Sequence, residues 1–209
     1  MKNLLQNTTR LAQAIWEHYL SPQLASGEYA AVDATCGRGN DTVWLAARCG
    51  RVYAFDIQPE AIAATREALH AAGVSSTREA SHAVSVSDAT AAASAVVLIE
   101  DSHADLAAYI REPIGLIVFN LGYLPGGDKD CTTAAASTLT ALQAAADRLA
   151  VGGLLSVILY RGHEAGKAER EAALAWASEL DRSIYHCVHT GMLNQPNCPP
   201  EILFITRKR

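Results

Sequence analysis

Two short segments contain residue types that suit the binding of a nucleoside: both contain acidic residues, and the first also contains glycines. The segment DATCGRGNDT, residues 33–42, follows a short apolar run and precedes a helical pattern, the context in which a glycine-rich loop is meaningful. Glycine lets the backbone turn tightly and approach a ligand without a Cβ atom in the way. The second segment, FDI at residues 55–57, ends the next apolar run, where a carboxylate can accept two hydrogen bonds from a ribose diol. The two segments together predict a nucleoside pocket.

The first loop suits S-adenosylmethionine better than a dinucleotide. A dinucleotide fingerprint has a third glycine where Thr42 stands, and an acid such as Asp33 rarely comes directly ahead of its loop. S-adenosylmethionine carries no phosphate, and it needs a carboxylate near its ammonium group and a glycine-lined wall beside its ribose. Asp33 would supply the carboxylate, Gly37 and Gly39 the wall, and Ile57 a cover for the adenine. The alternative is that the acids only cap helices and the glycines only turn the chain.

A third loop extends the predicted cofactor site towards the adenine. The segment EDSH, residues 100–103, ends the third apolar run, and Asp101 or Ser102 would receive the exocyclic amine there. For His103, a structural role as a helix-start residue that packs or caps is as good an interpretation as a role beside the adenine. The predicted cofactor-binding residues are Asp33, Thr35, Gly37, Gly39, Asn40, Asp41, Asp56, Ile57, Gln58, Asp101, Ser102 and Asn120.

The loop after the fourth apolar run carries the residue types expected beside a reacting group. It reads NLGYLPGGDK, residues 120–129, and combines three glycines and one proline with Asn, Tyr, Asp and Lys side chains. In an open α/β sheet the ligand crevice lies outside the carboxyl ends of the strands, where the strand order reverses. This loop should therefore face the group that is transferred.

These motifs resemble those of a known family, the small bacterial methyltransferases of the YtqB or MnmM group, once labelled rRNA methylases. Residues 33–42 look like its first motif and residues 120–129 like its most distinctive one. Residues 160–166 and 194–200 are similar too, and the resemblance spans residues 3–207. It implies an enzyme that uses S-adenosyl-L-methionine to methylate the aminomethyl group on the wobble uridine of tRNA, with the tRNA anticodon region as partner.

An aliphatic amine acceptor must lose a proton before its lone pair can attack the methyl carbon. Methyl transfer from a sulfonium is an in-line displacement, so positioning and desolvation should dominate. We expect Asn120 and the Leu121 carbonyl to orient the amine, and Asp128 or His163 to help remove its proton.

The substrate itself would be held by further side chains around this loop. Tyr123 would stack on or enclose the base, and Lys129 or Arg161 would hold a phosphate or a uracil oxygen, unless these two are ordinary surface charges. The predicted catalytic residues are Asn120, Asp128 and His163, and the predicted substrate-binding residues are Leu121, Tyr123, Lys129, Arg161 and Asn194.

The elements that must position these loops alternate short β-branched runs with longer helical patterns, which is typical of a parallel sheet with helices on both faces. We predict a doubly wound α/β fold of the Rossmann-like, class I methyltransferase type, with a mostly parallel seven-stranded sheet and an N-terminal helix, in one domain over residues 1–209. The last two strands should form an antiparallel edge pair. The Ala- and Ser-rich residues 74–94, longer than the family's usual connection, should form a surface excursion. The predicted strands are residues 29–34, 51–55, 95–99, 114–119, 154–160, 184–190 and 202–206, and the predicted helices are residues 3–20, 38–49, 59–73, 104–110, 132–149 and 167–180.

Composition and charge narrow the classes of function. The chain of 209 residues has a net charge of −5, which argues mildly against extended contact with nucleic-acid phosphates. Its five cysteines form no CxxC pair, so we expect neither a disulfide framework nor a metal. The chain lacks a long apolar run and starts with too many polar residues for a signal peptide, so we expect a cytoplasmic protein without membrane contact. A homodimer is an open alternative.

Two other functions stay open. Within the same enzyme class, the acceptor would be a base in rRNA or a small metabolite. In another class, the chain would be a non-catalytic nucleotide-binding or NAD-binding module, against which Thr42 in place of glycine speaks. A hydrolase has little support, since no GxSxG elbow occurs.

Overall fold

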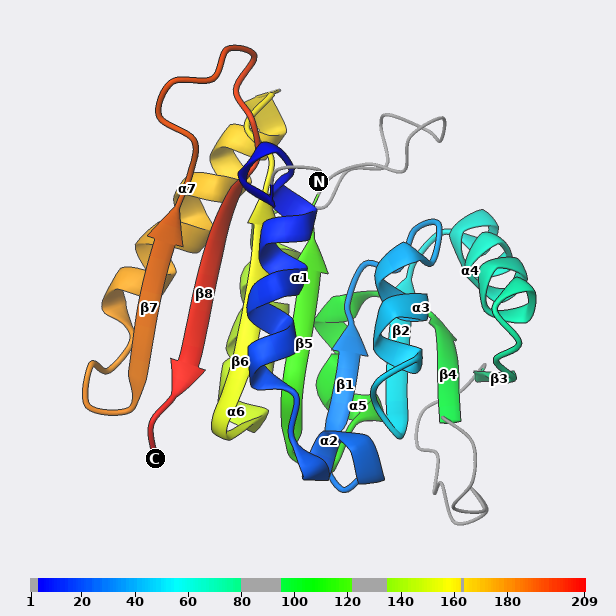
Figure 1. Ribbon diagram of the computed structural model, residues 1–209. Helices are drawn as coiled ribbons and strands as arrows, with labels where there is room; N and C mark the ends of the chain where they lie inside the picture. The colour runs from blue at the N-terminus through cyan, green and yellow to red at the C-terminus, as the bar shows by residue number, and fades with distance from the viewer. Residues whose placement is uncertain (1–3, 80–94, 122–134, 163) are drawn as a thin grey trace.

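A mostly parallel sheet runs through the part of the chain that the computed structural model describes, which is residues 4–79, 95–121, 135–162 and 164–209 (Figure 1). The strands in these ranges lie in the order β3-β4-β2-β1-β5-β6-β8-β7. They are β1 (Ala30–Asp33), β2 (Arg51–Asp56), β3 (Ser76–Glu79), β4 (Ala95–Glu100), β5 (Ile114–Asn120), β6 (Leu149–Leu159), β7 (Tyr185–Thr190) and β8 (Glu201–Arg207).

The strand order reverses between β1 and β5. β1 pairs in parallel with both β2 and β5, so the chain winds outward in both directions from this point. The apolar residues of β5 are all buried, as expected at the centre of a sheet that is covered on both faces. The carboxyl ends of β1, β2, β4 and β5 therefore meet at one edge of the sheet, where a doubly wound fold has its ligand crevice.

Helices cover both faces of the sheet and enclose one apolar core on each side. Because alternate residues of a strand point to opposite faces, Leu116 and Val118 of β5 belong to one core, and Ile117 and Phe119 to the other. None of the helices in the described ranges is long and apolar enough to cross a membrane. The first core lies under α1 (Thr8–Tyr19), α2 (Pro22–Ser26), α3 (Asn40–Ala46) and α4 (Pro59–Ala71), and the second under α5 (Leu106–Tyr109), α6 (Ala135–Arg148) and α7 (Glu164–Glu179); the 3-10 turns η1 (Leu4–Gln6) and η2 (His103–Asp105) precede α1 and α5.

The predicted fold class is confirmed, with one strand more than expected. The predicted antiparallel edge pair is also present, since β8 runs antiparallel to both β6 and β7. The additional strand, β3, pairs in parallel with β4 at the start of the stretch expected to be a surface excursion. A four-residue edge strand is too short to show a period in the sequence. Residues 80–94 lie outside the described part of the chain.

Several elements differ from their predicted bounds by a few residues: β6 begins at Leu149 rather than at residue 154, and α7 at Glu164 rather than at residue 167. At two other helices the capping residues explain the difference. The helix expected over residues 3–20 is the turn η1 followed by α1, which begins after the N-cap residue Asn7. The short helix α2, which was not predicted, begins at Pro22. The helix expected over residues 38–49 begins at Asn40, because Gly39 has a left-handed backbone with φ of +78°.

Trp16 anchors α1 to the sheet, and its removal should destabilise the fold. Its side chain is fully buried, and its ring meets Trp44 of α3 edge to face with 5.5 Å between the ring centroids. Trp16→Ala leaves a cavity, so we expect the free energy of unfolding in urea to fall by about 3–5 kcal/mol. Leu193→Ala serves as control, since that side chain is fully exposed. A Trp16 variant as stable as this control would contradict the anchoring role.

Candidate functional site

The carboxylate of Asp33 lies at the end of β1 and is buried. Its two oxygens accept hydrogen bonds from the Thr42 hydroxyl at 2.6 Å and from the Thr35 amide at 3.2 Å. Burial, together with the nearby charge of Asp41, raises the pKa of Asp33 to about 7. Thr42 stands where a dinucleotide fingerprint has its third glycine, and its hydroxyl there closes the loop onto Asp33. Contact between Asp33 and a ligand ammonium group stays a prediction.

Asp56, at the end of β2, turns towards the same loop. One of its oxygens accepts a hydrogen bond from the Gly37 amide and the other from the Gln58 amide, both at 3.0 Å. Burial raises the pKa of Asp56. The next side chain, Ile57, is 51% exposed, which leaves a large apolar group uncovered beside a carboxylate. The two acidic strand ends therefore converge on residues 33–42, with an apolar platform next to them.

Gly39 brings this loop against α4. A Cβ atom at Gly39 would lie 2.8 Å from the Thr65 Cα atom, and the Thr65 hydroxyl donates to the Gly37 carbonyl at 3.2 Å. Glycine alone fits both the left-handed backbone and this close approach. Asn40 follows as the exposed first residue of α3. We did not predict Thr65, because no local motif marks a residue 28 positions away from its partner.

A third carboxylate, Asp41, links three elements at the carboxyl edge of the sheet. The Gln13 amide of α1 donates to Asp41 at 3.0 Å, and the Asn120 side chain at the end of β5 also hydrogen-bonds it. Burial raises the pKa of Asp41, and burial together with the charge of Asp41 raises the pKa of Tyr160, which follows β6. The Asn120 backbone amide in turn donates to the Thr35 hydroxyl at 2.7 Å. Buried Asp41 and half-buried Asn120 therefore form a hydrogen-bonded pair beside the glycine-rich loop.

Two further residues lie next to the Asp41–Asn120 pair: Leu121 follows Asn120 in the chain, and Gln13 hydrogen-bonds Asp41. Leu121, predicted as a substrate contact, has a fully buried side chain, and its amide donates to the Ile158 carbonyl at 3.1 Å. Its side chain is therefore part of the core, while its own carbonyl stays a predicted contact. Gln13 was not predicted, because the sequence of its helix does not indicate which element the helix packs against.

The polar side chains of the loop after β4 hydrogen-bond mainly to neighbouring residues of the same turn. Asp101 accepts hydrogen bonds from the Ser102 amide at 2.7 Å and from the Tyr109 hydroxyl at 2.6 Å, and the Ser102 hydroxyl caps η2 by accepting from the Ala104 amide. The binding of an adenine amine by Asp101 or Ser102 stays a prediction. His103 is buried against the ring of Phe119, which supports the packing alternative, and burial lowers its pKa.

Several predicted substrate and catalytic residues cannot be placed in this site. Tyr123, Asp128, Lys129 and His163 lie outside the described residues. Arg161 follows β6, and its guanidinium lies 3.1 Å from the Glu201 carboxylate.

Glu201 contacts other basic side chains as well as Arg161. The same carboxylate lies 2.6 Å from Arg170 of α7 and 2.7 Å from His189 of β7. These interactions outweigh the effect of burial and lower the pKa of Glu201. Arg161 is thus part of an ion cluster rather than an isolated surface charge.

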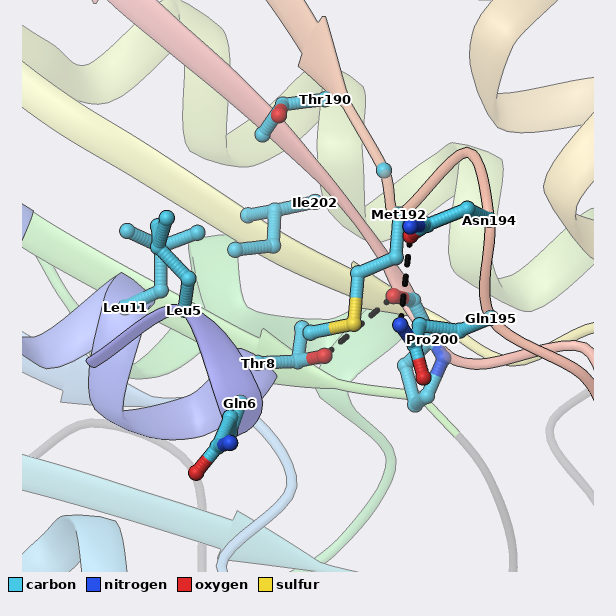
Figure 2. Close-up of a pocket in the computed structure, with 11 residues that line it drawn as sticks. Leu5, Gln6, Thr8, Leu11, Thr190, Met192, Asn194, Gln195, Pro200 and Ile202 are labelled. Atoms are coloured by element: carbon cyan, nitrogen blue, oxygen red, sulfur yellow. Dashed lines mark hydrogen bonds between the residues drawn. The ribbon is translucent and has the colours of Figure 1, made fainter. Parts of the chain in front are cut away.

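A hollow of about 480 Å³ opens near this edge, between the N-terminal turns and the segment that joins β7 to β8. Figure 2 shows Leu5 and Leu11 on one side of it, Met192 on the other and Ile202 between them. The predicted substrate residue Asn194 is one of its lining residues. The rest of the hollow was not predicted, since its walls come from opposite ends of the chain.

Known proteins with similar sequences are methyltransferases. The family model described as "Putative rRNA methylase" matches residues 52–206. A relative from Arabidopsis thaliana named "tRNA (mnm(5)s(2)U34)-methyltransferase, chloroplastic" is 34% identical over 213 residues, which cover 97% of this chain and 70% of the relative. The chain belongs to this rRNA methylase family.

Two solved structures that are similar to this chain have the same fold. One from Clostridium thermocellum, which has the same description as the family, is 33% identical with a TM-score of 0.78, and the match covers 99% of this chain and 98% of that one. A methyltransferase from Streptococcus mutans, solved in complex with SAH, is 35% identical with a TM-score of 0.75, and the match covers 93% and 97% of the two chains. The predicted family, the class I fold and the methyltransferase class are therefore confirmed.

Gly39→Ala tests whether the close contact with α4 shapes the loop. We expect the variant to lose most of its affinity for S-adenosylhomocysteine in calorimetric titration, because the added methyl group would push the loop away from Thr65. Gly73→Ala is the matched control: Gly73 also has a positive φ, of +74°, but has open space around its Cβ position. Equal affinities for the two variants would show that the contact with Thr65 does not shape the loop.

The raised pKa of Asp33 predicts a pH-dependent contribution to stability. Between its ordinary value of 3.8 and its folded value of about 7, the folded state binds the proton and the unfolded state does not. Stability from this group is therefore lost as the pH rises through that window, by up to about 1.4 kcal/mol per pH unit, and is constant above it. In urea titrations, the stability of the wild type relative to Asp33→Asn should fall from pH 5 to 7. A relative stability that rises with pH would contradict the assignment.

Proposed function

We propose that this chain transfers a methyl group from S-adenosylmethionine to the aminomethyl group on the wobble uridine of tRNA. The observation that carries the proposal is the convergence of Asp33 and Asp56 on one glycine loop, next to the Asp41–Asn120 pair. The name of the Arabidopsis relative supports the tRNA substrate, and the SAH in the Streptococcus structure supports the cofactor.

The described residues fit the cofactor in shape and chemistry. Asp56 stands at a strand end where a ribose diol binds in related folds, and the exposed Ile57 beside it suits the face of an adenine. Gly37 and Gly39 leave the backbone free of Cβ atoms along the loop. When bound, S-adenosylmethionine supplies an activated methyl group on a sulfonium. Asp33 holds the loop in shape for it.

Asn120 is the residue that we assign to orienting the acceptor amine. Its amide group donates to Asp41, which leaves the amide oxygen to accept a hydrogen bond from the amine. An amine held in this way presents its lone pair in a fixed direction, and fixed geometry is the main source of rate in a displacement of this kind. Removal of the proton is assigned to Asp128 or His163, as predicted from the sequence.

Nucleoside mass spectrometry tests the proposed reaction. A tRNA whose wobble uridine carries the unmethylated aminomethyl group is incubated with enzyme and S-adenosylmethionine, and the expected product is that nucleoside with one added methyl group. A parallel incubation with rRNA tests the alternative that the acceptor is a base in rRNA, as the family description says. Another with a small-molecule extract tests the alternative that the acceptor is a metabolite. Label in rRNA or in the extract, with none in tRNA, would overturn the proposed substrate.

Asn120→Ala should separate catalysis from cofactor binding. We expect kcat to fall roughly a hundredfold, as for the loss of one positioning donor or acceptor in other active sites. The affinity for S-adenosylhomocysteine should change little, because the hydrogen bonds from Thr42 to Asp33 and from Gln13 to Asp41 hold the loop without the Asn120 side chain. Asp128→Ala should behave in the same way if it is the base. Full activity in both variants would contradict the roles assigned to Asn120 and Asp128.

The remaining expectations stay predictions that complete the proposal. They are the cytoplasmic location, the absence of a metal, the single domain and a homodimer. Size-exclusion chromatography with light scattering measures the last of these directly.

A further inference from the structure

A row of residues leads across the sheet from the candidate catalytic residue to the hollow. The strand registers pair Asn120 with Ile158, Ile158 with Ile202, and Ile202 with Thr190. Neighbouring strands lie about 4.8 Å apart, so Ile202 is about 10 Å from Asn120. Ile158 and Ile202 belong to the core under α1, and the hollow opens on the same face of the sheet.

The walls of the hollow combine apolar surface with amide groups. Leu5, Leu11, Met192 and Ile202 supply apolar surface, and none of the eleven lining residues is charged. The Gln195 amide donates to the Asn194 amide oxygen at 3.2 Å. This contact leaves an N–H donor on Asn194 next to an oxygen acceptor on Gln195. A flat ligand with apolar faces and a mixed donor and acceptor edge fits this surface; a phosphate does not.

The segment that carries the two amides is held in a strained shape. Asn197 and Cys198 both have positive φ, of 63° and 47°. Consecutive non-glycine residues rarely adopt this region, and such strain is concentrated at ligand clamps. The segment is also tied to α1, because the Thr8 hydroxyl donates to the Pro200 carbonyl at 3.3 Å. The same helix carries Gln13, which holds Asp41.

We propose that the hollow receives a nucleobase that flanks the methylated uridine in the same RNA loop, with Asn194 and Gln195 reading its edge. The inference rests on the proposed tRNA substrate. Single-stranded RNA loops are recognised by unstacked bases that lie against apolar or aromatic side chains and hydrogen-bond through their edges. Stacked bases are separated by about 3.4 Å, so the distance of about 10 Å between Asn120 and Ile202 requires the flanking base to be unstacked. A volume of about 480 Å³ holds one such base.

Binding of an anticodon stem-loop RNA tests the inference. Affinities are measured by fluorescence polarisation, with S-adenosylhomocysteine present, for the wild type, for Asn194→Ala/Gln195→Ala and for Gln23→Ala. Gln23 is the matched control, because it carries the same amide on α2 at the opposite edge of the sheet (Figure 1). The RNAs are the intact stem-loop and a series in which one base near the target uridine is removed at a time, with the backbone kept intact.

The expected result is a coupling between one base and the two amides. The double variant should bind the intact RNA about tenfold more weakly than the wild type, the loss typical of one base contact. One abasic RNA should show the same loss with the wild type and no further loss with the double variant. Gln23→Ala should behave as the wild type throughout.

Other outcomes overturn the inference or the function separately. If the double variant loses no affinity, or if every abasic RNA weakens the wild type and the double variant equally, the hollow does not read a base. If the double variant instead changes the oligomeric state with unchanged RNA affinity, the hollow belongs to a contact between two copies. Both results are compatible with methylation of tRNA by the wild type, whereas absence of that methylation would remove the proposed function itself.

Discussion

The hydrogen bond from Thr42 to the buried Asp33 is the constraint on which the site depends. It closes the loop after β1 onto the start of α3, and so places Asp41, one residue before Thr42, at the carboxyl edge of the sheet. Gln13 and Asn120 then both hydrogen-bond Asp41. A contact between residues nine positions apart therefore sets the relation between α1, α3 and β5, which are distant in the sequence.

Two buried carboxylates so close together are unfavourable, and the surrounding hydrogen bonds offset only part of that cost. Desolvation raises the pKa of both Asp33 and Asp41, and the charge of Asp41 adds to the effect on Asp33. A protein that needed only stability would place apolar residues there. Polar groups that are held in place before the ligand arrives need no reorganisation during the reaction, and this is the advantage that such a site has.

The net charge of −5 conceals an uneven distribution at the carboxyl edge. On the α7 face, Glu201 is shared by Arg161, Arg170 and His189, so that basic groups outnumber the carboxylate. On the α1 face, the hollow is lined by neutral side chains alone. Overall acidity is thus weak evidence against an RNA substrate, because binding depends on the charge near the contact and screening removes the influence of distant charges.

Local sequence patterns were enough to predict the parallel sheet, the reversal of strand order between β1 and β5 and the loops that follow the strands. These features depend on local patterns: apolar runs such as residues 114–119, and glycines with an acid at the loop of residues 33–42. The sequence also led to Asn120 and Asp56, since a strand end places its next side chain at the crevice. Its errors were local as well, in the short strand β3 and in helix ends that capping residues decide.

The contacts between side chains of distant segments could not be predicted and were seen first in the folded chain. Gln13 against Asp41, Thr65 against Gly37, and Leu5 across from Met192 are contacts between segments that no local pattern relates. The tertiary structure also gave Arg161 a carboxylate partner and Leu121 a place in the core. The physical reason is that a period of two or 3.6 residues specifies which face of an element is apolar, but not which element will cover it. That choice depends on the packing of the whole chain.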